Sequence, residues 1–238
     1  MTQSIGNATR RRASDVVRRR LERAFRQHLR VSRARSRQLI SGTLLNDRAY
    51  ELHCLTYILS TLQSRHPGTR FVLSQGSRLA FRIKGGRVDR QNWPYIQAIR
   101  NGILVWEVWP NIEFVTASAR AAGRTPGWPT FGDTHELDIV VLEPNSATTG
   151  YPVSEEIVMG VEAKFRPYNK ELLKQLLGVR AEMCQPADVL DANGNKIPNA
   201  VGYIRPASRL FAFSPDAAIT RYGAPSALFD ISLHQLNL

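Results

Sequence analysis

Two stretches decide the expected fold: Glu136-Leu-Asp-Ile-Val-Val-Leu-Glu143 and Ile157-Val-Met-Gly-Val-Glu-Ala-Lys-Phe165. Each is an apolar run of strand length, and the connection between them is rich in Asn, Ser, Thr, Gly and Pro. Such runs, separated by turn-forming residues, predict two neighbouring strands, which we expect to form an antiparallel hairpin. Charged residues inside apolar strands are costly unless they have partners or a function. The charges within these two runs are therefore the first candidates for a functional site.

The expected hairpin brings these charges together. If it turns about Gly150, the numbers of paired residues sum to about 300, which places Asp138 across from Glu162 and Glu136 across from Lys164. Directly opposite residues lie within about 5.5 Å of one another. Two carboxylates that close repel each other unless a cation or a proton lies between them, and the adjacent lysine is expected to keep them ionised. The alternative is a surface hairpin that carries an ordinary cross-strand ion pair.

A hard divalent cation suits this arrangement. Mg²⁺, or Mn²⁺ in its place, is bound by one or two carboxylates, here Asp138 and Glu162, together with a main-chain carbonyl such as that of Ala163 and several waters. Beside a phosphodiester, such an ion lowers the pKa of an attacking water and neutralises charge on the phosphorus oxygens. Because side chains alternate along a strand, Lys164 shares a face with Glu162 and is placed to orient the water or to stabilise the developing charge.

Asp138 followed by Glu162-x-Lys164 at the end of an apolar strand resembles the PD-(D/E)xK nuclease superfamily. The resemblance covers about residues 47–213 and implies the restriction-endonuclease-like fold, an α/β domain whose mixed central sheet is flanked by helices. It also implies that Glu51, on the first core helix, lies near the metal, and that Gln175, on the helix after the lysine, assists the site. The alternatives are a boundary glutamate satisfied by a nearby arginine and a solvated helix glutamine.

The remaining pattern predicts one α/β domain at residues 46–238. A helix is expected from Asp47 to about Leu62, with leucines on one face, and a second helix from its cap at Asn169 to about Met183. Further strands are expected at 71–73, 79–83, 103–106, 112–116, 210–213 and 228–233, with an interruption near Pro110. A short helix is expected at 95–100, a loop at 117–134 and a turn-rich excursion at 185–207.

Residues 1–45 form a basic arm. They contain twelve arginines against Asp15 and Glu22, so this segment holds most of the formal net charge of +12. From Ser14 to about Arg30 the spacing of apolar residues predicts a narrow amphipathic helix. Its arginines suit phosphate groups, although a docking or solubilising helix and a transit peptide are the alternatives. The residues expected to bind nucleic acid are Arg18, Arg19, Arg23, Arg26 and Arg30 of the arm, and Arg166, Lys170 and Lys174 beyond the second strand, unless these last three simply form the wet side of their helix.

Composition excludes several other classes. The chain of 238 residues has no apolar run of about 18 residues, so no membrane span is expected. Its two cysteines cannot form a disulfide framework, which makes the cytoplasm the default location. His135-Glu136 lacks the second histidine of a zinc protease, and no glycine-rich phosphate loop is present. The four tryptophans are expected to pack in the core rather than to stack on bases.

The sequence therefore predicts a metal-dependent nuclease, with DNA favoured over RNA as its substrate and a restriction, repair or defence context. A non-catalytic nucleic-acid-binding or assembly subunit on the same fold is the alternative. In a third interpretation the arm docks a partner subunit and cleavage occurs only in the complex. A homo-oligomer is compatible with each of these.

Overall fold

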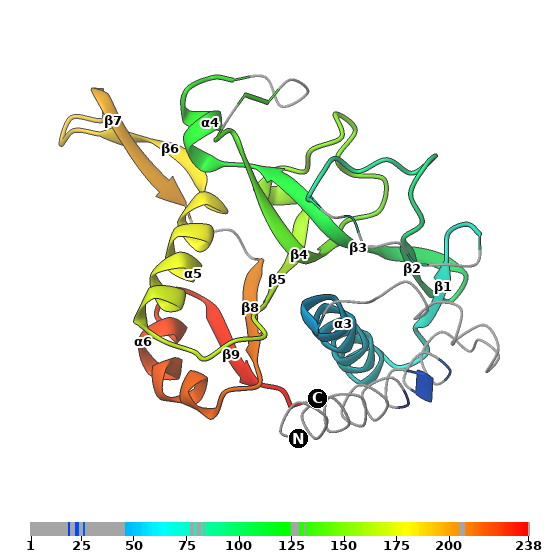
Figure 1. Ribbon diagram of the computed structural model, residues 1–238. Helices are drawn as coiled ribbons and strands as arrows, with labels where there is room; N and C mark the ends of the chain where they lie inside the picture. The colour runs from blue at the N-terminus through cyan, green and yellow to red at the C-terminus, as the bar shows by residue number, and fades with distance from the viewer. Residues whose placement is uncertain are drawn as a thin grey trace.

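The computed structural model describes residues 46–76, 84–124, 132–204 and 208–237, together with eight separate positions (Figure 1). Those positions are Arg19, Glu22, Arg23, Arg26, Leu79, Arg82, Pro129 and Thr130. The helix expected at 14–30 therefore lies largely outside the described residues, as does most of the strand expected at 79–83. The four described arm residues are helical, whereas Leu79 and Arg82 are not in a strand.

Within the described residues, seven strands form one mixed sheet in the order β1-β2-β3-β4-β5-β8-β9. Neighbours from β1 to β5 are antiparallel, whereas β5, β8 and β9 run parallel. A separate two-stranded sheet pairs β6 with β7. The strands are β1 (Arg70–Leu73), β2 (Ile96–Arg100), β3 (Ile103–Val115), β4 (Thr134–Leu142), β5 (Ile157–Ala163), β6 (Gln185–Leu190), β7 (Lys196–Ile204), β8 (Arg209–Ser214) and β9 (Ile231–Gln235).

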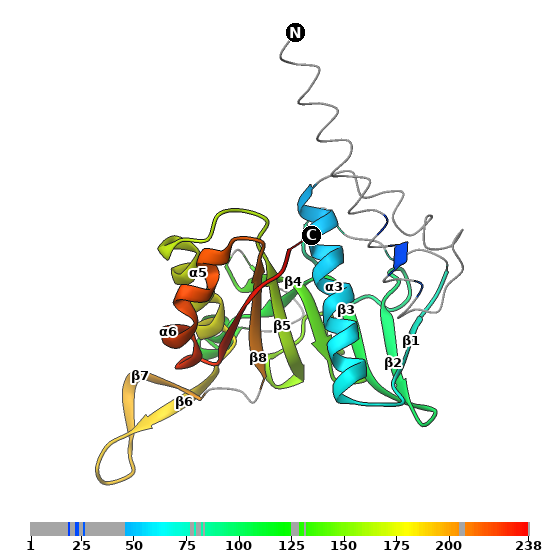
Figure 2. The same ribbon diagram turned by 90° about the horizontal axis from the view of Figure 1, so that it is seen from below.

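Two long helices cover opposite faces of the central sheet, α3 (Asn46–Arg65) and α5 (Lys170–Glu182) (Figures 1 and 2). Along β4, Val141 joins the core beneath α3, whereas Val140 joins the core beneath α5. Both faces of this strand are therefore buried, which explains its continuous apolar sequence. The shorter helices are α4 (Ala117–Ala121), η1 (Ser154–Glu156), η2 (Ala217–Tyr222) and α6 (Gly223–Ala227).

Both predicted long helices are confirmed. The first begins one residue before the expected start and ends about three residues after the expected end. The second begins after Asn169, whose side chain accepts a hydrogen bond of 3.1 Å from the main-chain N–H of Leu172 and so caps the helix as expected. The strands expected at 71–73, 136–142, 157–165 and 210–213 are present as β1, β4, β5 and β8, with shifts of one or two residues at some ends.

The short helix expected at 95–100 is wrong, because this segment is β2. Ile96 and Ala98 are buried and alternate with partly exposed residues, as a strand between two neighbours requires. Pro110 does not interrupt a strand either, since β3 is continuous across it. The register of β2 against β3 ends at Val108, so no ladder partner on that side requires the N–H that proline lacks.

Expectations for three further segments, two irregular stretches and the last strand, also differ from the structure. The excursion at 185–207 contains the β6–β7 hairpin, which projects from the body (Figure 1). Helix α4, capped by the Thr116 hydroxyl, begins the stretch expected to be loop. The last strand, β9, begins at Ile231, because α6 and a turn occupy the preceding residues.

The tryptophans lie in or against the core where the structure describes them. Trp109 is fully buried and stacks on Tyr95, and Trp93 and Trp106 pack against the two core clusters. Trp128 is outside the described residues. None of the helices in the described part of the chain is both long enough and apolar enough to cross a membrane.

Candidate active site

The register of the central hairpin places the two charged runs as expected. Ile139 pairs with Val161 and Val140 with Gly160, so the paired numbers sum to 300. The ladder ends at the Ile139–Val161 pair, one step before Asp138 and Glu162. Beyond this point Asp138 Oδ2 accepts a hydrogen bond of 2.7 Å from the N–H of Ala163. The carboxylate of Asp138 therefore occupies the position where the main-chain pairing stops.

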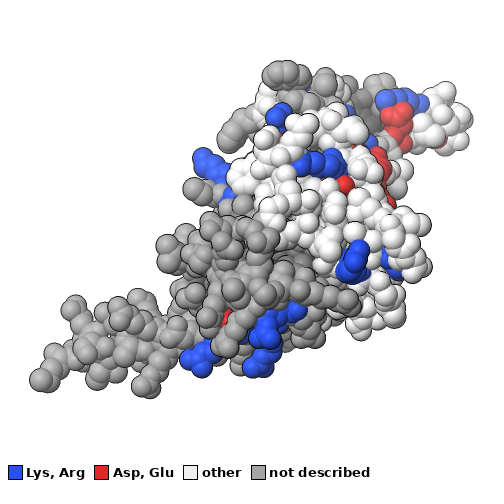
Figure 3. Space-filling view, turned by 90° about the vertical axis from the view of Figure 1, so that its right-hand side faces the viewer, with Lys and Arg blue, Asp and Glu red and all other residues white. Residues whose placement is uncertain are grey.

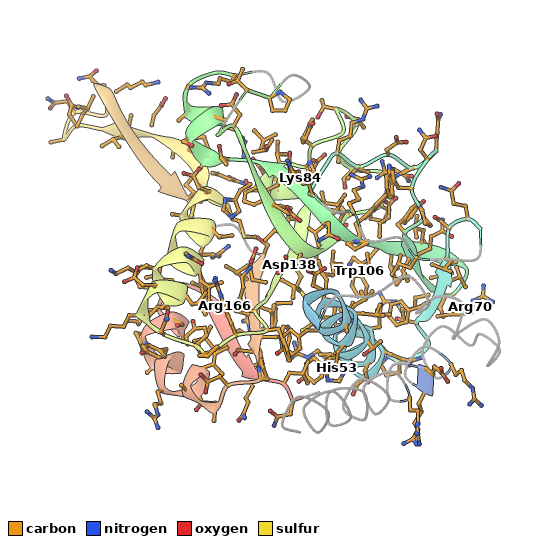
Figure 4. The ribbon with its side chains drawn as sticks, in the orientation of Figure 1. His53, Arg70, Lys84, Trp106, Asp138 and Arg166 are labelled. Atoms are coloured by element: carbon orange, nitrogen blue, oxygen red, sulfur yellow. The ribbon has the colours of Figure 1, made fainter. Side chains whose placement is uncertain are left out.

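Three predicted side chains meet at this end of the ladder. Lys164 Nζ forms an ion pair with Glu162 Oε2 and lies 3.4 Å from Asp138 Oδ2. The side chains of Glu162, Asp138 and Lys164 are 6%, 15% and 24% exposed, respectively. Figure 4 draws Asp138 near the centre of the view. The cluster is thus largely enclosed by the fold rather than on the surface, although the cross-strand ion pair of the alternative interpretation is present between Lys164 and Asp138.

The position of β8 helps to hold Glu162 and Lys164. Glu162 pairs with Ala212 of β8, and the N–H of Lys164 donates to the carbonyl of Phe213 at 2.8 Å. Main-chain bonds to two neighbouring strands, β4 and β8, therefore hold β5 along its length. The pairing expected between Glu136 and Lys164 does not form, because the β4–β5 ladder has already ended there.

The electrostatics of this cluster favour a cation. Burial, followed by the charge of Asp138, raises the pKa of Glu162 to about 8. Burial alone would lower the pKa of Lys164, but the charges of Glu162 and Asp138 outweigh it and raise that pKa. The buried carboxylate pair therefore holds a positive charge strongly, and in the structure the lysine ammonium supplies it. A divalent ion bound to both carboxylates would supply more.

Glu51, the remaining carboxylate expected near the metal, lies on helix α3. Glu51 is buried, and one turn later Cys54 is fully buried. Burial, then the charge of Asp138 and, more weakly, that of Glu51, raises the pKa of the Cys54 thiol well above its ordinary value. Both carboxylates therefore act on the same thiol. The location of Glu51 on the core helix is as expected, whereas its place beside a metal stays a prediction.

Gln175 is not on the inward side of its helix. Its side chain is exposed, and its amide oxygen accepts a hydrogen bond of 3.1 Å from Arg166. Residues of α5 that face the core are Leu172, Leu176 and Val179, and Gln175 lies outside that stripe. The structure thus places Gln175 with an exposed arginine, which agrees with the alternative of a solvated glutamine.

The expected phosphate-binding residues that are described are exposed. Arg166, Lys170 and Lys174 are on the surface, and Lys174 pairs with Glu171 at 2.9 Å. In the arm, Arg19, Arg23 and Arg26 are exposed, while Arg18 and Arg30 lie outside the described residues. Figure 3 shows separate areas of Lys and Arg on one face, with less surface from Asp and Glu. The described part of that face is therefore more basic than acidic.

Asn111 is a residue of this region that the pattern of the sequence did not single out. It lies on β3 opposite Asp138, where the register passes from Pro110–Ile139 to Ile112–Leu137. Its backbone has a φ of 50°, a conformation that asparagine tolerates better than most residues. Its amide nitrogen donates to Glu136 Oε1 at 3.2 Å. The only available signal was an asparagine directly after a proline within an apolar run.

Comparisons with protein-family models, with curated proteins and with solved structures found no match. Among the described residues, no three His, Cys, Asp or Glu side chains gather as a ready-made metal site. A divalent ion at the cluster would therefore rest on the carboxylates of Asp138 and Glu162, with a main-chain oxygen and water completing its shell. Mg²⁺ is usually bound through one or two carboxylates in this way, so the residues present fit it.

Replacing Glu162 by glutamine is expected to stabilise the metal-free protein while removing its response to metal. The folded chain raises the pKa of Glu162 from 4.5 to about 8, so the ionised form is disfavoured on folding and stability declines as pH rises between these values. Glutamine carries no such charge. Near pH 8, thermal unfolding should give a higher Tm for Glu162→Gln than for the parent, and Mg²⁺ or Mn²⁺ should raise only the parent's Tm. A lower Tm for the metal-free variant would contradict this interpretation.

Proposed function

We propose that this protein is a metal-dependent nuclease that hydrolyses phosphodiester bonds, with DNA favoured over RNA. The observation that carries the proposal is the meeting of Asp138, Glu162 and Lys164 at the end of the β4–β5 ladder. Two carboxylates share one lysine, and this group of side chains is partly exposed although the residues around it are buried. Such a group suits a divalent cation and a phosphate better than a purely structural role. The proposal includes the restriction-endonuclease-like arrangement of the PD-(D/E)xK superfamily, for which the mixed sheet between α3 and α5 is suitable.

Each residue has a distinct part in the proposed reaction. Asp138 and Glu162 would hold the divalent ion, with the main-chain oxygen of Ala163 and water as further ligands. When bound, the ion supplies Lewis-acid activation of water and neutralises negative charge on the phosphate. Lys164 donates its N–H groups to the attacking water or to a phosphate oxygen, a role that its existing contacts with both carboxylates keep oriented. Glu51 would add negative charge that strengthens cation binding.

The direct test is incubation of the full chain with plasmid DNA and Mg²⁺ or Mn²⁺, beside chelator and beside the Lys164→Ala and Asp138→Asn variants. Divalent-dependent strand cleavage by the parent alone would support the proposal. Cleavage that survives both substitutions would refute the assignment of the site. Parallel incubation with RNA decides between the two substrates, and the context of restriction, repair or defence depends on which DNA is cut.

A second candidate function follows from the arm. Its arginines would attract nucleic acid even if the carboxylate cluster never cut, so a non-catalytic binding or assembly subunit is the alternative. This function predicts DNA binding with a steep salt dependence and no cleavage with any divalent ion. Co-purification of a stable partner, with cleavage only in the complex, would instead support a docking role for the arm.

The proposed phosphate contacts of the arm lead to a quantitative prediction about the salt dependence of DNA binding. Replacing Arg18, Arg19, Arg23, Arg26 and Arg30 together by glutamine should lower the slope of log K against log salt by about 4.5 if each arginine contacts one phosphate. Fluorescence anisotropy with a labelled duplex at several salt concentrations measures this slope. The matched control is Arg221→Gln, which removes one exposed arginine from η2 and should change the slope by less than about 1. An unchanged slope in the five-residue variant would show that the arm is a docking or solubilising helix.

A further inference from the structure

A second acidic cluster lies next to the first and has no assigned role. Glu113 of β3 and Glu136 of β4 are directly paired in the antiparallel register. Side chains at paired positions stand about 5 Å apart, and like charges placed there destabilise a sheet. Among the described residues, neither glutamate forms an ion pair with a lysine or arginine. Their negative charges are therefore not compensated by a direct basic contact.

Neutral donors hold these two carboxylates in place. Glu136 accepts hydrogen bonds from the N–H of Gly85 at 2.9 Å and from Asn111 Nδ2 at 3.2 Å, and Glu113 accepts one from the Thr134 hydroxyl at 3.0 Å. The backbone of Gly85 packs directly over the pair, because a Cβ there would stand 2.8 Å from Glu136 and 2.9 Å from Glu113. The glutamates are thus fixed side by side rather than free to turn into solvent.

Asn111 provides an independent sign of a ligand. The residue is fully buried, and its amide oxygen has no hydrogen-bond partner among the described residues. A buried oxygen without a partner destabilises the fold unless something binds it. The bond from Asn111 Nδ2 to Glu136 places the amide beside one of the paired carboxylates. Two carboxylates and an unpartnered amide oxygen are the donors that a hard cation prefers.

The cluster is electrostatically connected to the candidate active site. After burial and the charge of Asp138, the charge of Glu136 also raises the pKa of Glu162. Asn111 lies opposite Asp138 in the β3–β4 register. Arg82 interacts electrostatically with Glu113, but its guanidinium donates to the carbonyl of Arg87 and lies over the ring of Trp93. The two acidic clusters are thus neighbours, and Lys164 forms ion pairs with the carboxylates of only one of them, Asp138 and Glu162.

We propose that Asn111, Glu113 and Glu136 form a second site for a hard divalent cation, beside the site at Asp138 and Glu162. This inference rests on the proposed function, because the second ion would add positive charge close to the same phosphodiester. Paired ions clamp the attacking and leaving oxygens in many enzymes that act on phosphate esters. The second site differs from the first in taking an amide oxygen and no lysine.

The test is the stoichiometry of Mn²⁺ binding, measured near neutral pH by calorimetry and by the paramagnetic resonance of free Mn²⁺. We expect two ions on the parent. Glu136→Gln should retain one ion and weaken the other by about tenfold or more, and Asp138→Asn should lose the opposite one. Glu113→Gln serves as a second variant in case Glu136→Gln fails to fold, and the matched control Glu143→Gln, at an exposed position just beyond β4, should bind as the parent does.

Each outcome separates this inference from the nuclease proposal. One ion on the parent, lost in Asp138→Asn and retained in Glu136→Gln, would overturn the second site while leaving the first intact. Glu113→Gln and Glu136→Gln variants that both bind two ions with the parent's affinity would also overturn it. Two ions on the parent without DNA cleavage would support the second site and refute the nuclease function.

Discussion

Lys164→Ala is expected to reduce Mg²⁺-dependent cleavage of plasmid DNA by at least about 100-fold, the usual effect of removing one electrostatic contact to a transition state. The ammonium of Lys164 is the basic group that contacts both Asp138 and Glu162. Its removal leaves two neighbouring carboxylates without their lysine and would take away the donor proposed to contact the phosphate. Initial rates of supercoiled-plasmid nicking measure the effect.

Asp138→Asn should produce a comparable loss by a different route. Asparagine retains the shape needed near the Ala163 N–H but removes one of the negative charges that bind the ion. Raising the Mg²⁺ concentration should restore part of the activity of Asp138→Asn and none of the activity of Lys164→Ala. The control is Lys196→Ala, which removes an exposed lysine from β7 of the separate two-stranded sheet and should leave the rate within about threefold, since one exposed charge alters binding only slightly. Equal activity in all three variants would place the chemistry elsewhere.

Arg90→Ala is expected to lower the free energy of unfolding by about 3–5 kcal/mol, the cost of leaving a buried charge without its partner. The side chain of Glu107 is fully buried and accepts bonds of 3.0 Å and 2.7 Å from Nε and Nη2 of Arg90. The indole of Trp109 and the N–H of Asn145 complete its shell at 3.0 Å and 3.1 Å. This pair ties the segment before β2 to the central strand β3.

Chemical denaturation followed by circular dichroism measures the effect of Arg90→Ala. The matched control is Arg120→Ala, which breaks the partly exposed pair with Glu155 and should cost at most about 1 kcal/mol. The double variant Arg90→Met with Glu107→Gln should recover much of the loss, because no charge then remains buried and the glutamine oxygen still accepts from buried donors. If Arg90→Ala were as stable as Arg120→Ala, the Glu107 site would have to admit water or another cation.

The two charged strand segments show how much of the structure the local sequence pattern can predict. Alternation and the length of the connection were sufficient to predict the register in which Ile139 pairs with Val161. The pattern could not show that the ladder stops there, because the end of pairing depends on how β5 continues beside β8. The same limit explains why the partner of Glu136 was predicted wrongly. It was expected opposite Lys164 and instead pairs with Glu113 of β3.

The predictions that the structure contradicts share one cause, which is that contacts between segments distant in the sequence decided the outcome. Segment 95–100 has no strong local preference, and it became a strand because β1 and β3, which come from either side in sequence, supply partners on both edges. Pro110 is tolerated within β3 because β2 ends before it. Gln175 was assigned to the inward side of its helix, whereas only contacts with the sheet determine which stripe of α5 is buried.

The amino-acid order alone determined the basic arm, the two long helices and the presence of charged residues in the apolar strand cores, because each depends on composition or on periodicity within one segment. The tertiary structure decided which charges meet. It brought Lys164 to two carboxylates, placed Asn111 and Glu113 beside Glu136, and buried Glu107 against Arg90. These contacts join segments that are distant in the chain, and their energies depend on the desolvation that packing alone produces.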